Sequence, residues 1–245
     1  MCIGLLPASW CVGGDLEVGD ANEPTFFLGL GGIVTSKPYI GVDAKAYPVP
    51  LVAYEGERLY FRGIVGGYRL ISEGGWSVGP VVQPRFDGYE EDDSSALEGM
   101  EDREFSVDAG LGVSLLTEVG LFGLNVVTDL LGRHDGQEIE FSYTIMFPVA
   151  EFDIIPSVGL RWQSNDLVDY YYGVRGDEVA FNRRAYAADD ALNPYVRVAA
   201  RRKLGGRWNA LVALQYEWLD NEIENSPIVD DDYDASILFG ALYSW

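Results

Sequence analysis

The sequence has no hydrophobic run long enough to form a membrane-spanning helix. Of its 245 residues 48% are hydrophobic, but mean hydropathy is zero. No stretch approaches the roughly 18 to 20 consecutive apolar residues that such a helix needs. The 29 glycines and 15 tyrosines instead suit short strands, tight turns and interfacial aromatic side chains. If the chain crosses a membrane, it must therefore do so as a closed β-barrel, in which every backbone group is paired between strands.

Cysteine and histidine are both scarce. Cys2 and Cys11 lie at the extreme N-terminus, so the rest of the chain offers no cysteine for a disulfide framework or a metal site. His134 is the single histidine, and we expect it in a short surface turn on the periplasmic side. Without a second histidine, neither a Ser-His-Asp constellation nor a zinc cluster can be assembled. Carboxylates such as Asp108 and Glu140 are expected in a salt network, so we predict a non-enzymatic protein without metal or cofactor.

Positively charged residues are few compared with acidic ones. The chain has 17 Lys and Arg against 39 Asp and Glu, a formal charge of −22. This excess argues against nucleic acid as a partner and against docking on anionic lipid. Acidic runs at 90–93, 189–190 and 230–234 are expected in solvated loops. Weak capture of divalent cations stays open as an alternative, because carboxylate oxygens suit hard ions.

The last eleven residues, 235–245, show the pattern expected of a membrane β-strand. Ala235, Ile237 and Phe239 share one face with Ala241, Tyr243 and Trp245, while the other face carries small or polar residues and leucines. A tilted transmembrane strand needs about 9 to 11 residues with this alternation. Outer-membrane barrels commonly finish on such a strand with a terminal aromatic residue.

The same alternation recurs along the chain. Together with 235–245 it gives eleven predicted strands, at 26–35, 44–54, 59–70, 76–86, 105–115, 122–130, 139–147, 154–162, 195–203 and 208–219. Long loops are predicted at 87–103, 163–193 and 220–234, with short turns between them, as in outer-membrane barrels. The fold class is therefore all-β: a closed antiparallel up-and-down transmembrane β-barrel.

Twelve strands are predicted, because both chain ends of a bacterial barrel lie on the periplasmic side and the count must be even. Residues 24–245 are expected to form the barrel domain. Residues 1–23 are expected to be an N-terminal segment with a clipped export signal and the first strand. Pro48 and Pro50 cannot donate to a strand ladder, so 44–54 is expected at a bulge or rim. Ten strands is the alternative if that segment is not a strand.

The apolar faces of the predicted strands are expected to contact lipid. The opposite faces are rich in Gly, Ser and Asp with a few Arg, which suits a wet lumen better than a solvated exterior. Trp208 and Trp218 bracket one strand, as in an interfacial aromatic girdle. The alternative is a soluble barrel with its apolar face inside. The predicted lumen charge network consists of Asp108, Asp129, Glu140, Arg161, Arg197 and Arg201.

Several segments resemble the MltA-interacting protein (MipA/OmpV) family of outer-membrane proteins. They are Tyr47-Pro48-Val49-Pro50, Tyr54-Glu55-Gly56, Phe61-Arg62-Gly63, Gly66-Gly67-Tyr68, Leu97-x-Gly99-Met100, Tyr170-Tyr171-Tyr172-Gly173-Val174 and Ser226-Pro227-Ile228-Val229. The resemblance implies a barrel in the outer membrane of a Gram-negative bacterium, in contact with outer-membrane lipid. It also implies a scaffold that connects a murein hydrolase with a peptidoglycan synthase in cell-envelope and peptidoglycan maintenance.

The family motifs fall mostly in predicted loops. The expected mouth or contact residues are Tyr171, Tyr172, Gly173, Arg183, Tyr186, Ser226 and Pro227. They could fold inward over the barrel mouth as a constriction or present a contact surface. The leading functional hypothesis is a non-enzymatic scaffold, and the alternative is a small-solute channel or uptake barrel. A lipid-modifying enzyme is a third hypothesis.

Overall fold

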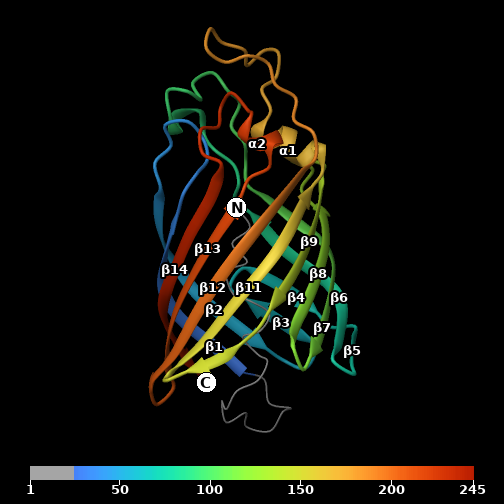
Figure 1. The fold of residues 1–245 in the computed structure, drawn as a ribbon, viewed down its shortest axis with the longest axis vertical. Coiled ribbons are helices and arrows are strands. Elements are labelled where there is room, and N and C mark those ends of the chain that lie inside the picture. The colour runs from blue at the N-terminus through green and yellow to red at the C-terminus, as the bar shows by residue number, and fades with distance from the viewer. Residues whose placement is uncertain (1–24) are drawn as a thin grey trace.

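The computed structural model describes residues 25–245, which form one closed antiparallel β-barrel (Figure 1). Within this range fourteen strands make a single sheet. They are β1 (Thr25–Thr35), β2 (Lys45–Glu55), β3 (Leu59–Arg62), β4 (Val65–Tyr68), β5 (Ile71–Glu73), β6 (Trp76–Arg85), β7 (Ser106–Thr117), β8 (Gly120–Asp129), β9 (Gln137–Thr144), β10 (Phe147–Val149), β11 (Phe152–Gln163), β12 (Ala191–Gly205), β13 (Trp208–Trp218) and β14 (Tyr233–Ser244). The loops contain the 3-10 helix η2 (Glu91–Asp93) and the helices α1 (Asn165–Tyr172) and α2 (Asn221–Glu224). No helix of the described range has the length and apolar character needed to cross a membrane.

Twelve of the described strands form the ring. It runs β1-β2-β3-β4-β6-β7-β8-β9-β11-β12-β13-β14 and closes where β14 pairs with β1, from Phe27 opposite Ser244 to Thr35 opposite Ser236. β5 and β10 lie outside the ring as extensions of the hairpins that they form with β6 and β11. The prediction of a closed twelve-stranded antiparallel barrel is confirmed, and the ten-strand alternative is wrong.

The twelfth strand arises from a division that the sequence pattern did not predict. Residues 59–70, predicted as one strand, contain the β3–β4 hairpin, in which Arg62 pairs with Val65 across a turn at Gly63. Gly63 has φ +66°, a left-handed conformation that glycine adopts without strain. The export signal and additional strand predicted for residues 1–23 lie outside the described residues. Within the described ring, β1 pairs directly with β14.

β2 is a full-length strand, so the predicted bulge or rim at its prolines is wrong. It pairs with β1 at every residue, with Pro48 opposite Gly32 and Pro50 opposite Leu30. The amide of Gly63 donates to the carbonyl of Val52, which shows that the even-numbered residues of β2 direct their backbone groups toward β3. β3 pairs with β2 only at Ala53–Glu55. Both prolines therefore lie along an edge with no partner strand, where a missing N–H breaks no ladder.

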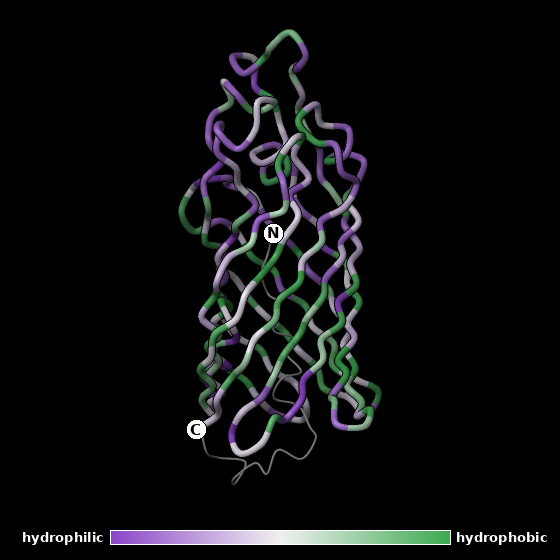
Figure 2. Tube along the Cα trace, turned by 90° about the vertical axis from the view of Figure 1, so that its left-hand side faces the viewer, coloured by the Kyte–Doolittle hydropathy of each residue, from purple (hydrophilic) through white to green (hydrophobic). Residues whose placement is uncertain are grey.

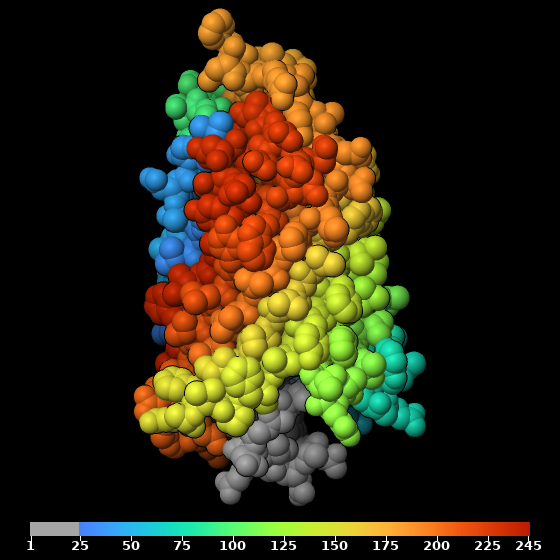
Figure 3. All heavy atoms as spheres, in the orientation of Figure 1, coloured from blue at the N-terminus to red at the C-terminus, as the bar shows by residue number. Residues whose placement is uncertain are grey.

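The apolar faces of the strands point outward. Phe141, Val158 and Leu214 are 45%, 51% and 50% exposed, while Asp108 and Arg197 are buried inside the barrel. Hydrophobic residues are concentrated along the strands and hydrophilic ones at the long-loop end (Figure 2), and β11 to β14 make up the central part of one face of the wall (Figure 3). A soluble barrel would bury these apolar residues at its centre. The prediction that the apolar faces point out of the barrel is confirmed.

The two ends of the barrel differ in their connections. Long loops with α1 and α2 gather at one end, and short turns and the C-terminus lie at the other (Figure 1). In outer-membrane barrels the short turns are periplasmic and the long loops extracellular. The connection from β8 to β9, residues 130–136, belongs to the long-loop end because β7 and β8 form their hairpin at Thr117–Gly120 on the other end. The predicted periplasmic position of His134 is therefore wrong.

Candidate functional site

The extracellular loops pack into an apolar cap over the mouth of the barrel. We call the cap the buried cluster formed by Tyr39, Tyr89, Leu97, Met100, Leu167, Val168, Tyr171, Tyr172, Val174, Ala188, Ala191, Ile223, Ile228 and Val229. These residues come from four connections far apart in the sequence. Their burial removes apolar surface from water and orders the loops against one another.

Helix α1 contributes its apolar stripe to the cap. Leu167, Val168, Tyr171 and Tyr172 are all buried, and their i, i+1, i+4, i+5 spacing places them on one face of the helix. The hydroxyl of Tyr39 donates to the carbonyls of Asp87 (3.0 Å) and Tyr171 (3.3 Å). Burial raises the pKa of Tyr39 well above its usual value, so the hydroxyl stays a donor. The two predicted tyrosines of this helix thus fold inward.

Gly173 ends α1 because no side chain fits there. Its N–H donates to the carbonyl of Asp169 at 2.9 Å. A Cβ atom at Gly173 would lie 2.3 Å from that same oxygen. The glycine of the tyrosine-rich motif therefore allows the chain to turn from the helix into the loop without displacing Asp169, whose carboxylate accepts from the N–H of Ala188.

Arg183 fastens the longest loop to its neighbour. Its guanidinium donates to the carbonyls of Glu178 (2.9 Å), Ala96 (2.6 Å) and Glu98 (3.1 Å). It is buried, so these bonds replace water that the side chain lost on folding. The contacts join residues nearly ninety positions apart and hold the loop after β6 against the loop after α1.

Tyr186 and Ser226 fasten the third long loop. The hydroxyl of Tyr186 donates to the carbonyl of Glu222 at 2.9 Å. Ser226 Oγ donates to the carbonyl of Tyr172 at 2.6 Å, and Pro227 follows it, partly buried. The predicted loop residues of both motifs therefore meet within the cap, on the inner side rather than on an open contact surface.

A buried ion pair in the cap had no clear signal in the sequence. Arg103 Nη2 lies 2.8 and 2.9 Å from the two carboxylate oxygens of Glu178. Burial disfavours the Glu178 charge, but backbone N–H donors from Arg175 and Glu101 and the Arg103 guanidinium outweigh it, so the pKa of Glu178 lies below its usual value. Both residues stand in irregular loops, where no alternation reports which side chains point inward.

Below the cap, a layer of buried charges crosses the lumen. Arg85 is fully buried, and its guanidinium lies 2.6 to 2.8 Å from oxygens of Asp87, Asp108 and Glu138. Arg161 continues the layer, pairing with Glu140 at 2.9 Å and with Glu217. These ion pairs link the inner faces of β6, β7, β9, β11 and β13.

The predicted network members are distributed among different partners. Asp108 meets Arg85 and His134 rather than the predicted arginines. Arg197 binds the amide oxygen of Gln215 at 2.7 and 3.0 Å. Arg201 pairs with Asp153 at 2.6 Å, nearer the periplasmic end. Of the predicted set, the structure pairs Arg161 with Glu140 and brings Asp108 close to Asp129, while Arg197 and Arg201 have other partners.

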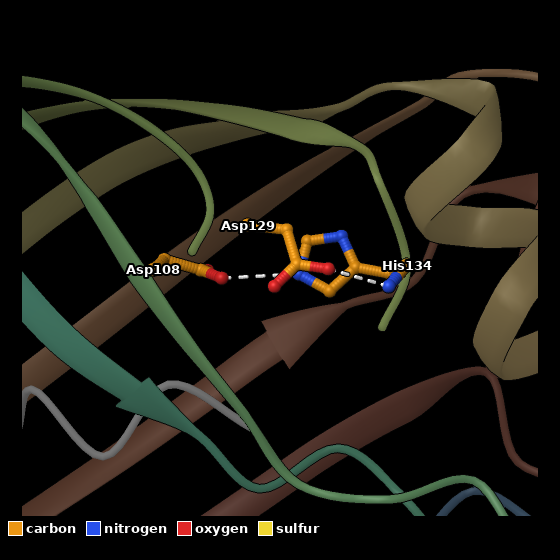
Figure 4. Close-up of side chains that lie close together, drawn as sticks. All are labelled: Asp108, Asp129 and His134. Atoms are coloured by element: carbon orange, nitrogen blue, oxygen red, sulfur yellow. Dashed lines mark hydrogen bonds and ion pairs between the residues drawn. The ribbon is translucent and has the colours of Figure 1, made fainter. Parts of the chain in front are cut away.

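Asp108, Asp129 and His134 approach one another closely (Figure 4), with potential ligand atoms within 4.8 Å. His134 Nδ1 accepts from the N–H of Gly136 (3.1 Å), and Nε2 lies 3.0 Å from Asp108. This assigns the proton to Nε2, so neither ring nitrogen offers a lone pair to a metal. The predicted surface turn is wrong: His134 is 4% exposed, its ring centroid 6.0 Å from that of Tyr171.

Asp129 organises the turn that carries His134. Its carboxylate accepts from Ser106 Oγ at 2.6 Å and from the backbone N–H groups of Leu131, His134 and Asp135 at 2.9, 2.6 and 3.1 Å. Ser106 is thus bonded to a carboxylate and not to the imidazole, so the three side chains lack the order of a nucleophilic triad. The group is a structural network that supports the cap from below.

A polar chamber of about 420 Å³ lies in the periplasmic half of the lumen. Charged and amide side chains line it, among them Glu55, Arg62, Asn125, Glu140 and Arg197. Arg62 stacks over the ring of Tyr60 at 4.4 Å and pairs with Glu55 at 3.1 Å. The lumen is therefore polar toward the periplasm, holds the buried charge layer near the extracellular ends of the strands and is covered by apolar packing above that layer.

These features define a transmembrane β-barrel of the bacterial outer membrane with a closed extracellular mouth. The family model described as MltA-interacting protein MipA matches residues 28–245, and the chain belongs to this family. It is 28% identical over 226 residues to the MltA-interacting protein of Escherichia coli (strain K12), covering 91% of each chain. It is 28% identical over 142 residues to the outer membrane protein OmpV of Vibrio cholerae, covering 58% of this chain and 55% of OmpV.

Among solved structures, a Pseudomonas aeruginosa FadL homologue aligns with a TM-score of 0.43 and 8% identity, over 91% of this chain and 89% of that one. No functional conclusion follows from this similarity.

Proposed function

We propose that the protein is a non-enzymatic scaffold that holds a murein hydrolase and a peptidoglycan synthase at the periplasmic surface of the outer membrane. The main support for this proposal is the closed extracellular mouth of the barrel. A barrel whose loops are fastened by Arg183, Tyr186 and Ser226 over a buried charge layer is built to be rigid rather than to conduct. The similarity to the MltA-interacting protein of Escherichia coli supports the murein hydrolase as a partner.

The periplasmic end offers a surface for such partners. The β10–β11 hairpin extends past the ring and exposes Phe147, Val149 and Phe152. The β5–β6 hairpin extends likewise, with Ile71 and Trp76 exposed. Exposed apolar side chains on protruding hairpins favour protein contacts.

Capture from solubilised outer membranes tests the proposal. The tagged full-length chain should retain murein hydrolase activity, detected by zymography. Val149→Glu should weaken this retention, whereas Leu131→Glu, on the extracellular turn, should leave it unchanged. Equal retention by both variants and by an unrelated barrel of similar size would refute the scaffold.

The small-solute channel is the second candidate, and the polar chamber favours it. The two functions separate in planar bilayers. The scaffold predicts negligible conductance, because the cap and charge layer block the lumen. Steady cation-selective conductance would support the channel and contradict the scaffold.

The hydrogen bonds of His134 favour a structural role over lipid modification. His134→Ala should therefore leave the composition of envelope lipids unchanged, as measured by mass spectrometry of outer-membrane extracts.

A further inference from the structure

The barrel wall is open between β2 and β6 in its extracellular half. The strands between them, β3 and β4, are only four residues long each. β3 pairs with β2 at Ala53–Glu55, and β4 pairs with β6 at Val81 and Val82. Above the β3–β4 turn, residues 45–51 of β2 and 83–85 of β6 face each other across a gap without a paired strand in the described range.

The residues along both edges of this gap are suited to remaining unpaired. On β6, the carbonyl of Val78 accepts from the N–H of Leu70. The even-numbered residues of β6 therefore direct their backbone groups toward β4, and Pro84, which lies beyond the end of β4, faces the gap. Pro48 and Pro50 face it from β2. An N–H without a partner is costly in hydrocarbon, and proline has none to leave unpaired. Three prolines on the two facing edges therefore stabilise an opening that ordinary strand residues would not.

An apolar cavity of about 870 Å³ lies behind the gap. Its lining includes Ile33, Tyr47, Val49, Leu51, Phe105 and Leu238, from β1, β2, β14 and the segment before β7. This volume lies within the range of ligand pockets in proteins, which are mostly apolar with a few polar groups. The same lining also holds seven charged residues toward the extracellular end, Lys37, Lys45, Glu90, Asp93, Asp102, Arg103 and Glu104.

A lysine crosses the top of the gap. Lys37, in the loop after β1, donates to the carbonyls of Phe86 (2.8 Å) and Gly88 (2.9 Å), which follow β6. The two loops lie side by side at the extracellular end (Figure 1). Among the described residues no carboxylate lies within ion-pair distance of Lys37, and its ammonium has a third N–H. The neighbouring cations differ: Lys45 pairs with Asp93, and Arg103 with Glu178.

We propose that the gap is a lateral port for a long-chain fatty acid, which enters from the membrane with its chain in the apolar cavity and its carboxylate at Lys37. The opening faces lipid, so the molecules that reach it carry hydrocarbon. Among residues 25–245 the Lys37 ammonium has no carboxylate at ion-pair distance, and one ammonium matches one carboxylate. A phosphorylated lipid would call for several donors or a guanidinium fork, and Arg103 is already bound by Glu178.

Electron paramagnetic resonance tests the port with the full chain refolded into phosphatidylcholine vesicles. The probes are spin-labelled stearic acid and its methyl ester. The wild-type protein should show an immobilised component with the acid. Val49→Trp, which fills the cavity, should abolish this component. Leu214→Trp, on the lipid face of β13 away from the gap, should leave it unchanged.

Lys37→Met separates headgroup recognition from chain binding. Losing one charged hydrogen bond should weaken binding of the acid about tenfold and leave the ester unaffected. The loop position of Lys37 leaves the strand ladder intact, so this variant remains informative if Val49→Trp fails to fold. The port is refuted if the wild type immobilises no acid or if Val49→Trp matches it. A phospholipid or lipid A retained stoichiometrically in the wild-type cavity, seen by native mass spectrometry, would also overturn the assignment.

Discussion

Replacing Arg85 with methionine should cost more stability than any other single change in the lumen. The guanidinium contributes four hydrogen bonds of 2.6 to 2.8 Å to Asp87, Asp108 and Glu138 and has no exposure to solvent. Its removal takes the guanidinium partner from three carboxylates buried within the barrel. Removing one partner of a buried ion pair costs about 3 to 5 kcal/mol, and bonds that share one network are not additive. We therefore expect a loss in this range and not the sum over four bonds.

The matched control is Arg197→Met. Its guanidinium is also buried, but it binds the neutral amide of Gln215, so no carboxylate of that contact is stranded. A hydrogen bond to a charged group contributes about 1.5 to 3 kcal/mol. We therefore expect Arg197→Met to lower the free energy of unfolding by at most this amount. The free energy of unfolding of both variants is measured by titrating the refolded barrel in vesicles with guanidinium chloride and following tryptophan fluorescence. Equal losses for the two would refute the reasoning, since they would show that the charge layer contributes no more than ordinary packing.

Three further predictions concern the wall, the cap and the port. Leu214→Arg at mid-strand should lower the free energy of unfolding by about 2–4 kcal/mol, and Leu204→Arg near the periplasmic turn by about 0–1 kcal/mol. The same unfolding assay measures both, and equal losses would contradict the placement of the barrel in the membrane. Gly173→Ala should loosen the cap because its Cβ would press on the carbonyl of Asp169, and limited proteolysis of intact vesicles should then cleave the loop after α1 faster. Burial lowers the pKa of Lys37 to about 8, below its unfolded value of 10.5. The unfolded chain therefore binds more protons between these two pH values, and the free energy of unfolding should rise with pH across this window. Unfolding measured as a function of pH should lack this rise in Lys37→Met.

The strands could be predicted because alternate residues face different media. Lipid on one side and the lumen on the other impose a period of two, and Phe141, Val158 and Leu214 obey it. The strand predictions are wrong where glycine or proline changes the backbone without disturbing the alternation of side chains. Gly63 turns the chain inside a segment that otherwise looks continuous. Pro48 predicts a bulge or rim, but the absence of a partner strand on its outer edge makes proline compatible with a regular strand there.

The candidate site was less predictable because its contacts join distant strands. Alternation tells which face a residue occupies but not its height in the barrel or the strand opposite. Arg85, Asp108 and Glu138 come from β6, β7 and β9 and meet only through the register of the ring. The prediction for His134 is wrong for a related reason. A short turn is typical of the periplasmic end, but the burial of His134 depends on Tyr171, more than thirty residues away in the sequence.

The junction of β1 with β14 has a consequence for biogenesis. It joins the first and last described strands, so the final set of backbone hydrogen bonds forms only after translation has delivered β14. A nascent chain that has emerged as far as β13 carries two unpaired edges that invite association with other chains. Until β14 pairs with β1 those edges stay open to other chains, so the moment of closure rather than the strength of the finished barrel decides whether the polypeptide escapes aggregation.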